Sequence, residues 1–205
     1  MQASVSFVIE IRDLGILTDN KLAMSQHICT VVKKARTTAS LIFKCFHSRH
    51  RASYLKAFTT YLRPLLEYAT PVWSPYIITN ITKIESVERS FTKRLLGLSN
   101  LPYTKHLEFL GIDSLELLRL CYGLVFVYKM LFGLVDLKFS DYFTLRANST
   151  TRGHDYKLFQ TYSRLNVRKH FFCEWVVHIW NNLDGCHFEN HKKWLQFFFV
   201  VKAAV

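Results

Sequence analysis

Acidic residues are scarce in this sequence, and two long stretches contain none. The 205 residues include 15 Asp and Glu against 27 Lys and Arg, a formal net charge of +12. Residues 21–66 carry nine Lys and Arg residues without one acid, and residues 156–173 carry four, again without an acid. The positive electrostatic potential of such stretches favours a polyanionic partner, most often a nucleic acid. A solvated basic surface gives the same composition.

The sequence also lacks the features of secreted and membrane proteins. Residues 1–11 have neither the basic start nor the long apolar run of a signal peptide. The apolar stretch 115–134 is interrupted by Arg119 and Lys129, so we predict a buried helix there and no membrane span. The five cysteines are odd in number and scattered, which indicates reduced thiols in an intracellular protein.

Motifs of several enzyme classes are missing as well. Neither a glycine-rich phosphate loop nor a Gly-x-Ser-x-Gly nucleophile motif occurs. The C-terminal cysteines and histidines lack the paired Cys-x-x-Cys spacing of zinc sites. We therefore predict no metal site and interpret these cysteines and histidines as ordinary helix and loop positions. They are Cys173, His178, Cys186, His187 and His191.

Hydrophobic periodicity, by contrast, is strong along most of the chain. Alternating apolar residues up to Ile11, followed by a turn at Asp13-Leu14-Gly15, predict a β-hairpin. Helical spacing begins at Ser25, a predicted N-cap, and a kink is expected at Pro64. The first and third predicted helices each carry an apolar stripe: Ile28, Val32, Ala35, Ala39, Ile42 and Phe46 in the first, and Ile84, Val87, Phe91, Leu95 and Leu98 in the third. Thr82 and Glu85 suit a capping box. Helices are predicted over about residues 25–46, 51–68, 82–97, 103–110, 114–132 and 171–183.

The predicted fold is therefore mainly α. A helical bundle of residues 25–135 is preceded by a short β-hairpin in residues 1–24. Residues 136–205 form a less regular, basic extension with one amphipathic helix.

Five segments, in a fixed order, carry a resemblance to a known family. They read "IRDLGILTDNKLAMSQHI", "YLRPLLEYATPVWSPY", "ITKIESVERSFTKRLLGL", "LEFLGIDSLELLRL" and "NSTTRGHDYKLF…SRLNVRKHFFCEWVVHIWNNL". Together they resemble the C-terminal part of the reverse transcriptases of non-LTR, LINE-type retrotransposons of the jockey-like kind. The resemblance runs from about Ile11 to Leu183, and residues 184–205 depart from the family's pattern.

The resemblance implies a polymerase whose fingers and palm lie outside this chain. Asp13, Leu14 and Gly15 would belong to a hairpin at the end of the palm that helps hold the primer terminus, and residues 25–135 would form the thumb. The family acts in the nucleus or the cytoplasm. Its basic extension, which is expected to contact RNA or target DNA, would here include Arg152, Lys157, Arg164, Arg168 and Lys169.

The catalytic part of such a polymerase is not apparent. Two-metal nucleotidyl transfer needs clustered carboxylates, and the family's aromatic-x-Asp-Asp motif would precede "DLG". Asp141, in "FSDY", is a single acid far beyond that point. Four further acids belong to different predicted elements: Asp13, Asp19, Glu67 and Asp113. We predict no catalytic residue, no cofactor in this chain (Mg²⁺ belongs to the parent polymerase) and no DNA synthesis by the chain alone.

Two functional hypotheses stay open. In the first, a basic thumb binds RNA or an RNA–DNA duplex, and Lys33, Lys34, Arg36 and Lys44 of one predicted helix contact phosphates without reading sequence. In the second, the chain is a non-catalytic helical interaction module or an inert remnant of a degenerate mobile element. A steep dependence of binding on salt would favour the first.

Overall fold

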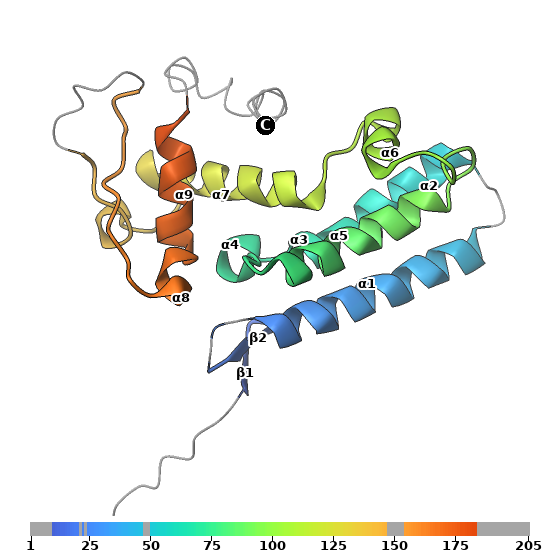
Figure 1. The fold of residues 1–205 in the computed structure, drawn as a ribbon, viewed down its shortest axis with the longest axis horizontal. Helices are drawn as coiled ribbons and strands as arrows, with labels where there is room; N and C mark the ends of the chain where they lie inside the picture. The colour runs from blue at the N-terminus through green and yellow to red at the C-terminus, as the bar shows by residue number, and fades with distance from the viewer. Residues whose placement is uncertain (1–9, 21, 23, 47–49, 147–153, 184–205) are drawn as a thin grey trace, which may run out of the picture. The chain divides into compact units, whose positions relative to one another are not determined.

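In the computed structural model the chain is mainly helical and begins with a short β-hairpin, as predicted (Figure 1). The structure describes residues 10–20, 22, 24–46, 50–146 and 154–183. They form two compact units, which we describe separately. Unit 1 contains the described residues of Met1–Ala69 and Pro75–Glu116, and unit 2 contains those of Thr70–Ser74 and Leu117–Val205. The division follows Glu116 and differs from the boundary expected at residue 135, because most of the predicted long apolar helix packs within unit 2.

The hairpin of unit 1 joins two antiparallel strands, β1 (Glu10–Asp13) and β2 (Ile16–Asp19). Its two turn residues, Leu14 and Gly15, have φ angles of 44° and 85°. Two successive left-handed residues match the twist of the flanking strands, which is why short hairpins use such turns. Glycine adopts this conformation freely, whereas leucine does so at a cost.

The first helix, α1 (Ser25–Cys45), follows the hairpin directly. The predicted apolar stripe is largely confirmed, since Ile28, Val32, Ala35 and Ile42 are buried. The predicted N-cap is wrong. Met24 occupies that position in a left-handed conformation, and Ser25 Oγ instead accepts a hydrogen bond of 3.0 Å from Asn80 Nδ2.

Near Pro64, where a kink was expected, the structure shows a change of hydrogen-bonding pattern. An α-helical turn, α2 (Arg51–Ala57), passes into a π-helical turn, η1 (Phe58–Leu62), and then into α3 (Arg63–Glu67). The N–H of Arg63 donates to the carbonyl of Phe58, five residues earlier. Proline has no N–H to donate, and the widened turn just before it allows the chain to continue helically.

Unit 1 is completed by α5 (Ile78–Lys93) and α6 (Tyr103–Leu110). The predicted stripe of this region is confirmed as buried: Ile84, Val87, Phe91, Leu95 and Leu98. The predicted capping box at Thr82 and Glu85 is wrong, because the helix begins four residues before Thr82 and Ile77 is its N-cap. Phe91 packs against Phe43 and Phe58, with ring centroids 4.8 and 5.0 Å apart.

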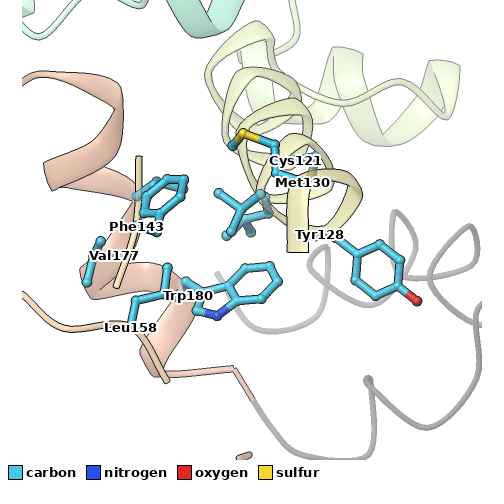
Figure 2. Close-up of a cluster of buried hydrophobic side chains, with 10 residues drawn as sticks. Cys121, Tyr128, Met130, Phe143, Leu158, Val177 and Trp180 are labelled. Atoms are coloured by element: carbon cyan, nitrogen blue, oxygen red, sulfur yellow. The ribbon is translucent and has the colours of Figure 1, made fainter. Parts of the chain in front are cut away.

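Unit 2 has an apolar interior built mainly from two helices. Its elements are α4 (Thr70–Trp73), α7 (Leu115–Leu131, from Leu117 onward), η2 (Phe139–Asp141), α8 (Asn166–Lys169) and α9 (Phe172–Asn181). Figure 2 shows the core, in which Val177 and Trp180 of α9 pack with residues of α7. Trp180 Nε1 donates to the carbonyl of Tyr156 at 2.8 Å. Trp73 is also buried, and the guanidinium of Arg119 lies 5.4 Å from its ring centroid.

No helix in the described part of the chain is long and apolar enough to cross a membrane. The predicted buried helix corresponds to α7, in which Arg119 is buried and Lys129 is exposed.

Candidate nucleic-acid interface

The helices α1 and α5 run beside each other in unit 1 (Figure 1). A cavity of about 450 Å³ lies on the surface there. We call it the basic groove. Its lining comes from one face of α1 and from one residue of α5: Cys29, Val32, Lys33, Arg36, Thr37, Ser40 and Lys83. Three of these side chains are cationic and two are hydroxyls, and no carboxylate occurs among the described residues that line the groove. The groove is therefore suited to an anion.

Helical spacing explains why the cations gather here. Lys33, Arg36 and Ser40 are three or four residues apart along α1, so they share one face of the helix, and Lys44 continues the same face toward its C-terminal end. The apolar stripe of α1 lies on another face and packs inward. Three of the four predicted cations of this helix, Lys33, Arg36 and Lys44, thus share one face and are exposed, and two of them, Lys33 and Arg36, line the groove.

Two contacts connect α1 with α5 at the groove. Arg36 Nη2 donates a hydrogen bond of 3.0 Å to Ser86 Oγ, and Lys83 Nζ lies 3.9 Å from Cys29 Sγ. These contacts position the guanidinium and the ammonium group while leaving both exposed. Lys83 was not among the predicted contacts. Lys83 lies 50 residues after Lys33 in the chain, and sequence alone does not show which helix packs beside α1. It therefore could not be predicted to line the same groove.

Lys34 lies on a different face of α1 from Arg36 and Ser40. Lys34 is exposed, and its charge acts on the buried His27, which lies two helical turns earlier. Burial lowers the pKa of His27, and the charges of Lys34 and Arg12 lower it further. The ring is therefore neutral near pH 7, which lets its Nδ1 accept a hydrogen bond of 3.3 Å from the N–H of Leu17. This contact ties β2 to α1.

The turn of the hairpin is exposed and is held from one side. Asp13, Leu14 and Gly15 are all exposed, and Leu14 presents 81% of its surface to solvent. The hydroxyl of Tyr68 donates to the carbonyl of Leu14 at 3.0 Å, which fixes the turn relative to the end of α3. Strained and exposed backbone of this kind is often found at functional sites.

A buried polar cluster lies under α5, and the sequence analysis missed it. Tyr103 Oη lies 2.5 Å from Glu85 Oε1 and 2.8 Å from Glu88 Oε2. A phenol has one proton and cannot donate to both carboxylates, so a protonated carboxyl must supply the second hydrogen bond. Burial raises the pKa of Glu88 to about 8, and Glu88 is the carboxyl that keeps its proton near pH 7.

This cluster has a structural role. Two glutamates three residues apart on the apolar stripe of α5 were the available sequence signal, since charged residues are rarely buried unless they are paired. Among the described residues, no three His, Cys, Asp or Glu side chains gather in a way that could hold a metal ion. Cys186, His187 and His191 lie outside the described residues.

The predicted nucleic-acid contacts in the C-terminal extension differ in their exposure to solvent. Arg164, Arg168 and Lys169 are exposed, and Arg168 Nε lies 3.4 Å from Glu174 Oε1. Lys157 is buried, with 7% of its surface exposed, so the structure does not present it to a ligand. Arg152 lies outside the described residues.

The chain is similar to an uncharacterized protein of Caenorhabditis elegans. The two are 27% identical over 97 residues, which make up 47% of this chain and 49% of the worm protein. The chain therefore spans about half the length of the relative that it matches. No family model matches the chain. No solved structure matches it either.

Proposed function

We propose that this chain is the thumb and downstream part of a non-LTR retrotransposon reverse transcriptase, and that unit 1 binds the backbone of RNA or of an RNA–DNA duplex. The observation that carries the proposal is the basic groove, where Lys33, Arg36 and Lys83 meet without an opposing carboxylate among the described lining residues. Cations of this kind bind phosphates and release counterions, which gives affinity without reading base sequence.

The hairpin supports the same proposal. A thumb that follows a primer-holding hairpin needs the two to be rigidly joined, and His27 and Tyr68 each make a hydrogen bond to the hairpin backbone. Asp13, Leu14 and Gly15 would contact the primer end, as the resemblance implies. The palm and fingers of the parent protein would be the partners of this surface, in the nucleus or the cytoplasm.

Binding, and not catalysis, is the role we assign to the chain. Asp13 and Asp19 lie at the ends of the hairpin, Glu67 pairs with Arg63 at 2.7 Å, and Asp113 follows α6. Asp141 ends the short helix η2 of unit 2. Two-metal polymerisation would require several such carboxylates within one site. The parent polymerase would supply Mg²⁺ and its ligands.

The test is the salt dependence of binding to a short RNA–DNA hybrid, measured by fluorescence anisotropy. Each lost phosphate contact should lower the slope of log affinity against log salt by about 1. The groove variant, Lys33→Gln with Arg36→Gln and Lys83→Gln, should therefore lose about 3 from this slope.

A charge control separates local contacts from net charge. Lys129, Lys138 and Arg146 of unit 2 are exposed and do not line the groove, and changing all three to Gln removes the same charge. This variant should keep most of the slope. Equal slopes for wild type and groove variant, or no binding by wild type at low salt, would instead favour a helical interaction module or an inert remnant.

A further inference from the structure

A second cavity, of about 440 Å³, opens on the surface of unit 2. It is lined by residues 160–163, by Lys169 and by three residues of α9: Glu174, Trp175 and His178. Its size falls within the usual range for small-ligand pockets, roughly 300–1,000 Å³. We call it the stacking pocket, because two of its lining residues are Tyr162 and Trp175.

The two aromatic residues differ in how they are held. Tyr162 is 85% exposed and makes no ring contact or hydrogen bond with the described residues. Trp175 is half-buried, packs edge-on against Phe172 at 5.9 Å between ring centroids, and lies against Gly123 of α7. A fixed indole and a free phenol at one cavity provide a surface on which a flat ring can stack.

One lining residue of the same cavity carries a buried hydroxyl without a hydrogen-bond partner among the described residues. Ser163 is 8% exposed, and its Oγ has no hydrogen-bond partner among the described residues. A buried polar group without a partner costs about 1–3 kcal/mol, and a ligand that supplies the partner recovers this free energy. Ser163 lines the stacking pocket and its Oγ is closed to solvent, so a ligand that displaces its cover and reaches Oγ gains a directed hydrogen bond as well as an apolar surface.

The stretch of chain that supplies most of the cavity's lining is basic. Lys169 lines the cavity, and Arg164 and Arg168 are exposed on the same short stretch of chain, which contains no acid between residues 156 and 173. The one carboxylate of the lining, Glu174, is engaged by Arg168 at 3.4 Å. Phe159 and Phe171, which lie within this stretch, are also more than half exposed. Exposed aromatics among cations are typical of surfaces that bind single-stranded nucleic acid.

We propose that the stacking pocket binds one unpaired base of single-stranded RNA or DNA. Tyr162 and Trp175 stack against the base, Ser163 hydrogen-bonds to its edge, and Lys169 contacts a neighbouring phosphate. Bases within a duplex are already stacked and paired, so this ligand differs in chemistry from the duplex backbone assigned to the basic groove. The pocket belongs to the other unit, and either proposal can fail without the other.

The experiment measures binding of the full chain to a short oligouridylate and to an abasic oligomer of equal length. Stacking on an aromatic side chain contributes about 1–3 kcal/mol per base, so Tyr162→Ala should weaken oligouridylate binding about tenfold or more. Tyr162→Phe keeps the ring and should bind within about twofold of wild type. Abasic binding should be unchanged in both variants, because phosphate contacts are intact.

Two further variants keep the result specific. Tyr142→Ala removes an exposed tyrosine of unit 2 outside the pocket and should bind oligouridylate like wild type. Ser163→Ala should weaken oligouridylate binding without affecting the abasic oligomer. The proposal is overturned if wild type does not prefer the oligouridylate, or if Tyr162→Ala binds it as tightly as wild type. Equal losses for both oligomers would also overturn it, since they would point to a purely electrostatic contact.

Discussion

The two acid-free stretches of this chain have the same charge signature and build different surfaces. The first stretch, residues 21–66, contains α1, whose helical period collects Lys33, Arg36 and Lys44 on one face with small hydroxyl residues between them. Residues 156–173 are mostly irregular, and they expose large aromatics beside their cations. Charge composition alone predicts a polyanion for both, but the local structure separates a phosphate groove from a pocket for a base.

The interiors of the two units also differ, in the kind of polar side chain that each of them buries. Unit 1 buries an acidic cluster, in which Glu85 and Glu88 meet Tyr103, whereas the described part of unit 2 buries basic side chains instead: Arg119, His154 and Lys157. We therefore expect the two units to respond differently to core substitutions and to pH.

The largest effect is expected from Phe91→Ala in unit 1. Phe91 is fully buried among Phe43, Tyr54 and Phe58, and truncating such a ring costs about 3–5 kcal/mol of unfolding free energy. Urea unfolding would measure the loss, and hydrogen exchange should locate it in α1 and α5. Leu41→Ala, at an exposed position of α1, should change stability by less than about 0.5 kcal/mol.

A pH-dependent effect of similar size is expected from Glu88. Its pKa is raised in the folded state to about 8 by burial, so the stability it contributes is complete below its ordinary pKa and is lost as the pH rises through 8. The loss is on the order of 4 kcal/mol. Glu88→Gln stays neutral and should abolish it.

The measurement is unfolding free energy at pH 5 and pH 9 for wild type and Glu88→Gln. Groups facing Glu88 are Glu85 on α5, Tyr103 on α6, and Arg63 and Glu67 on α3. Burial and the nearby carboxylates raise the pKa of Tyr103, so the phenol stays protonated in this range. If Glu88→Gln loses as much stability at pH 9 as wild type does, Glu88 is not the titrating group.

A smaller, stabilising effect is expected at the hairpin turn. Leu14→Asn places an Asn-Gly pair where both residues have positive φ, and this pair suits such turns better than Leu-Gly does. The gain should be about 0.5–1 kcal/mol, because Leu14 is exposed and little packing is lost. Thermal unfolding would detect it. A destabilised variant would mean that Leu14 makes contacts which its exposure does not suggest.

The smallest net change in stability is expected from Gly123→Ala in unit 2. Alanine favours the helix by about 1 kcal/mol, but its methyl group would lie 3.0 Å from Trp175 Cη2 and would push the indole. These effects oppose each other, so the unfolding free energy should change little. Oligouridylate binding should nevertheless weaken, whereas binding of the RNA–DNA hybrid should not, since α1 and α5 are untouched.

Much of the fold was predictable because it follows from local patterns. The hairpin followed from alternation and a Gly-containing turn, the stripes of α1 and α5 from helical spacing, and an irregular helix near Pro64 from a missing donor. The helix starts were not predictable in the same way. Ile77 and Met24 act as N-caps without a side-chain hydrogen bond, so the usual capping signals pointed to the wrong residues.

The site was predictable only where a single element carries it. Lys33, Arg36 and Lys44 share a helix face, which spacing reveals. Lys83 joins them only because α5 packs beside α1, and the burial of Lys157 depends on tertiary packing. The stacking pocket combines an irregular segment with α9, and no periodic signal in the sequence links Tyr162 to Trp175.

The central claim is that the two acid-free stretches bind different parts of a nucleic acid, and a crossed binding experiment tests it most directly. The groove variant and Tyr162→Ala would each be titrated with an RNA–DNA hybrid and with an oligouridylate at one salt concentration. We predict that the groove variant loses mainly hybrid affinity and Tyr162→Ala mainly oligouridylate affinity. Losses that are equal for both ligands in both variants would contradict the claim and reduce the two surfaces to one undirected basic charge.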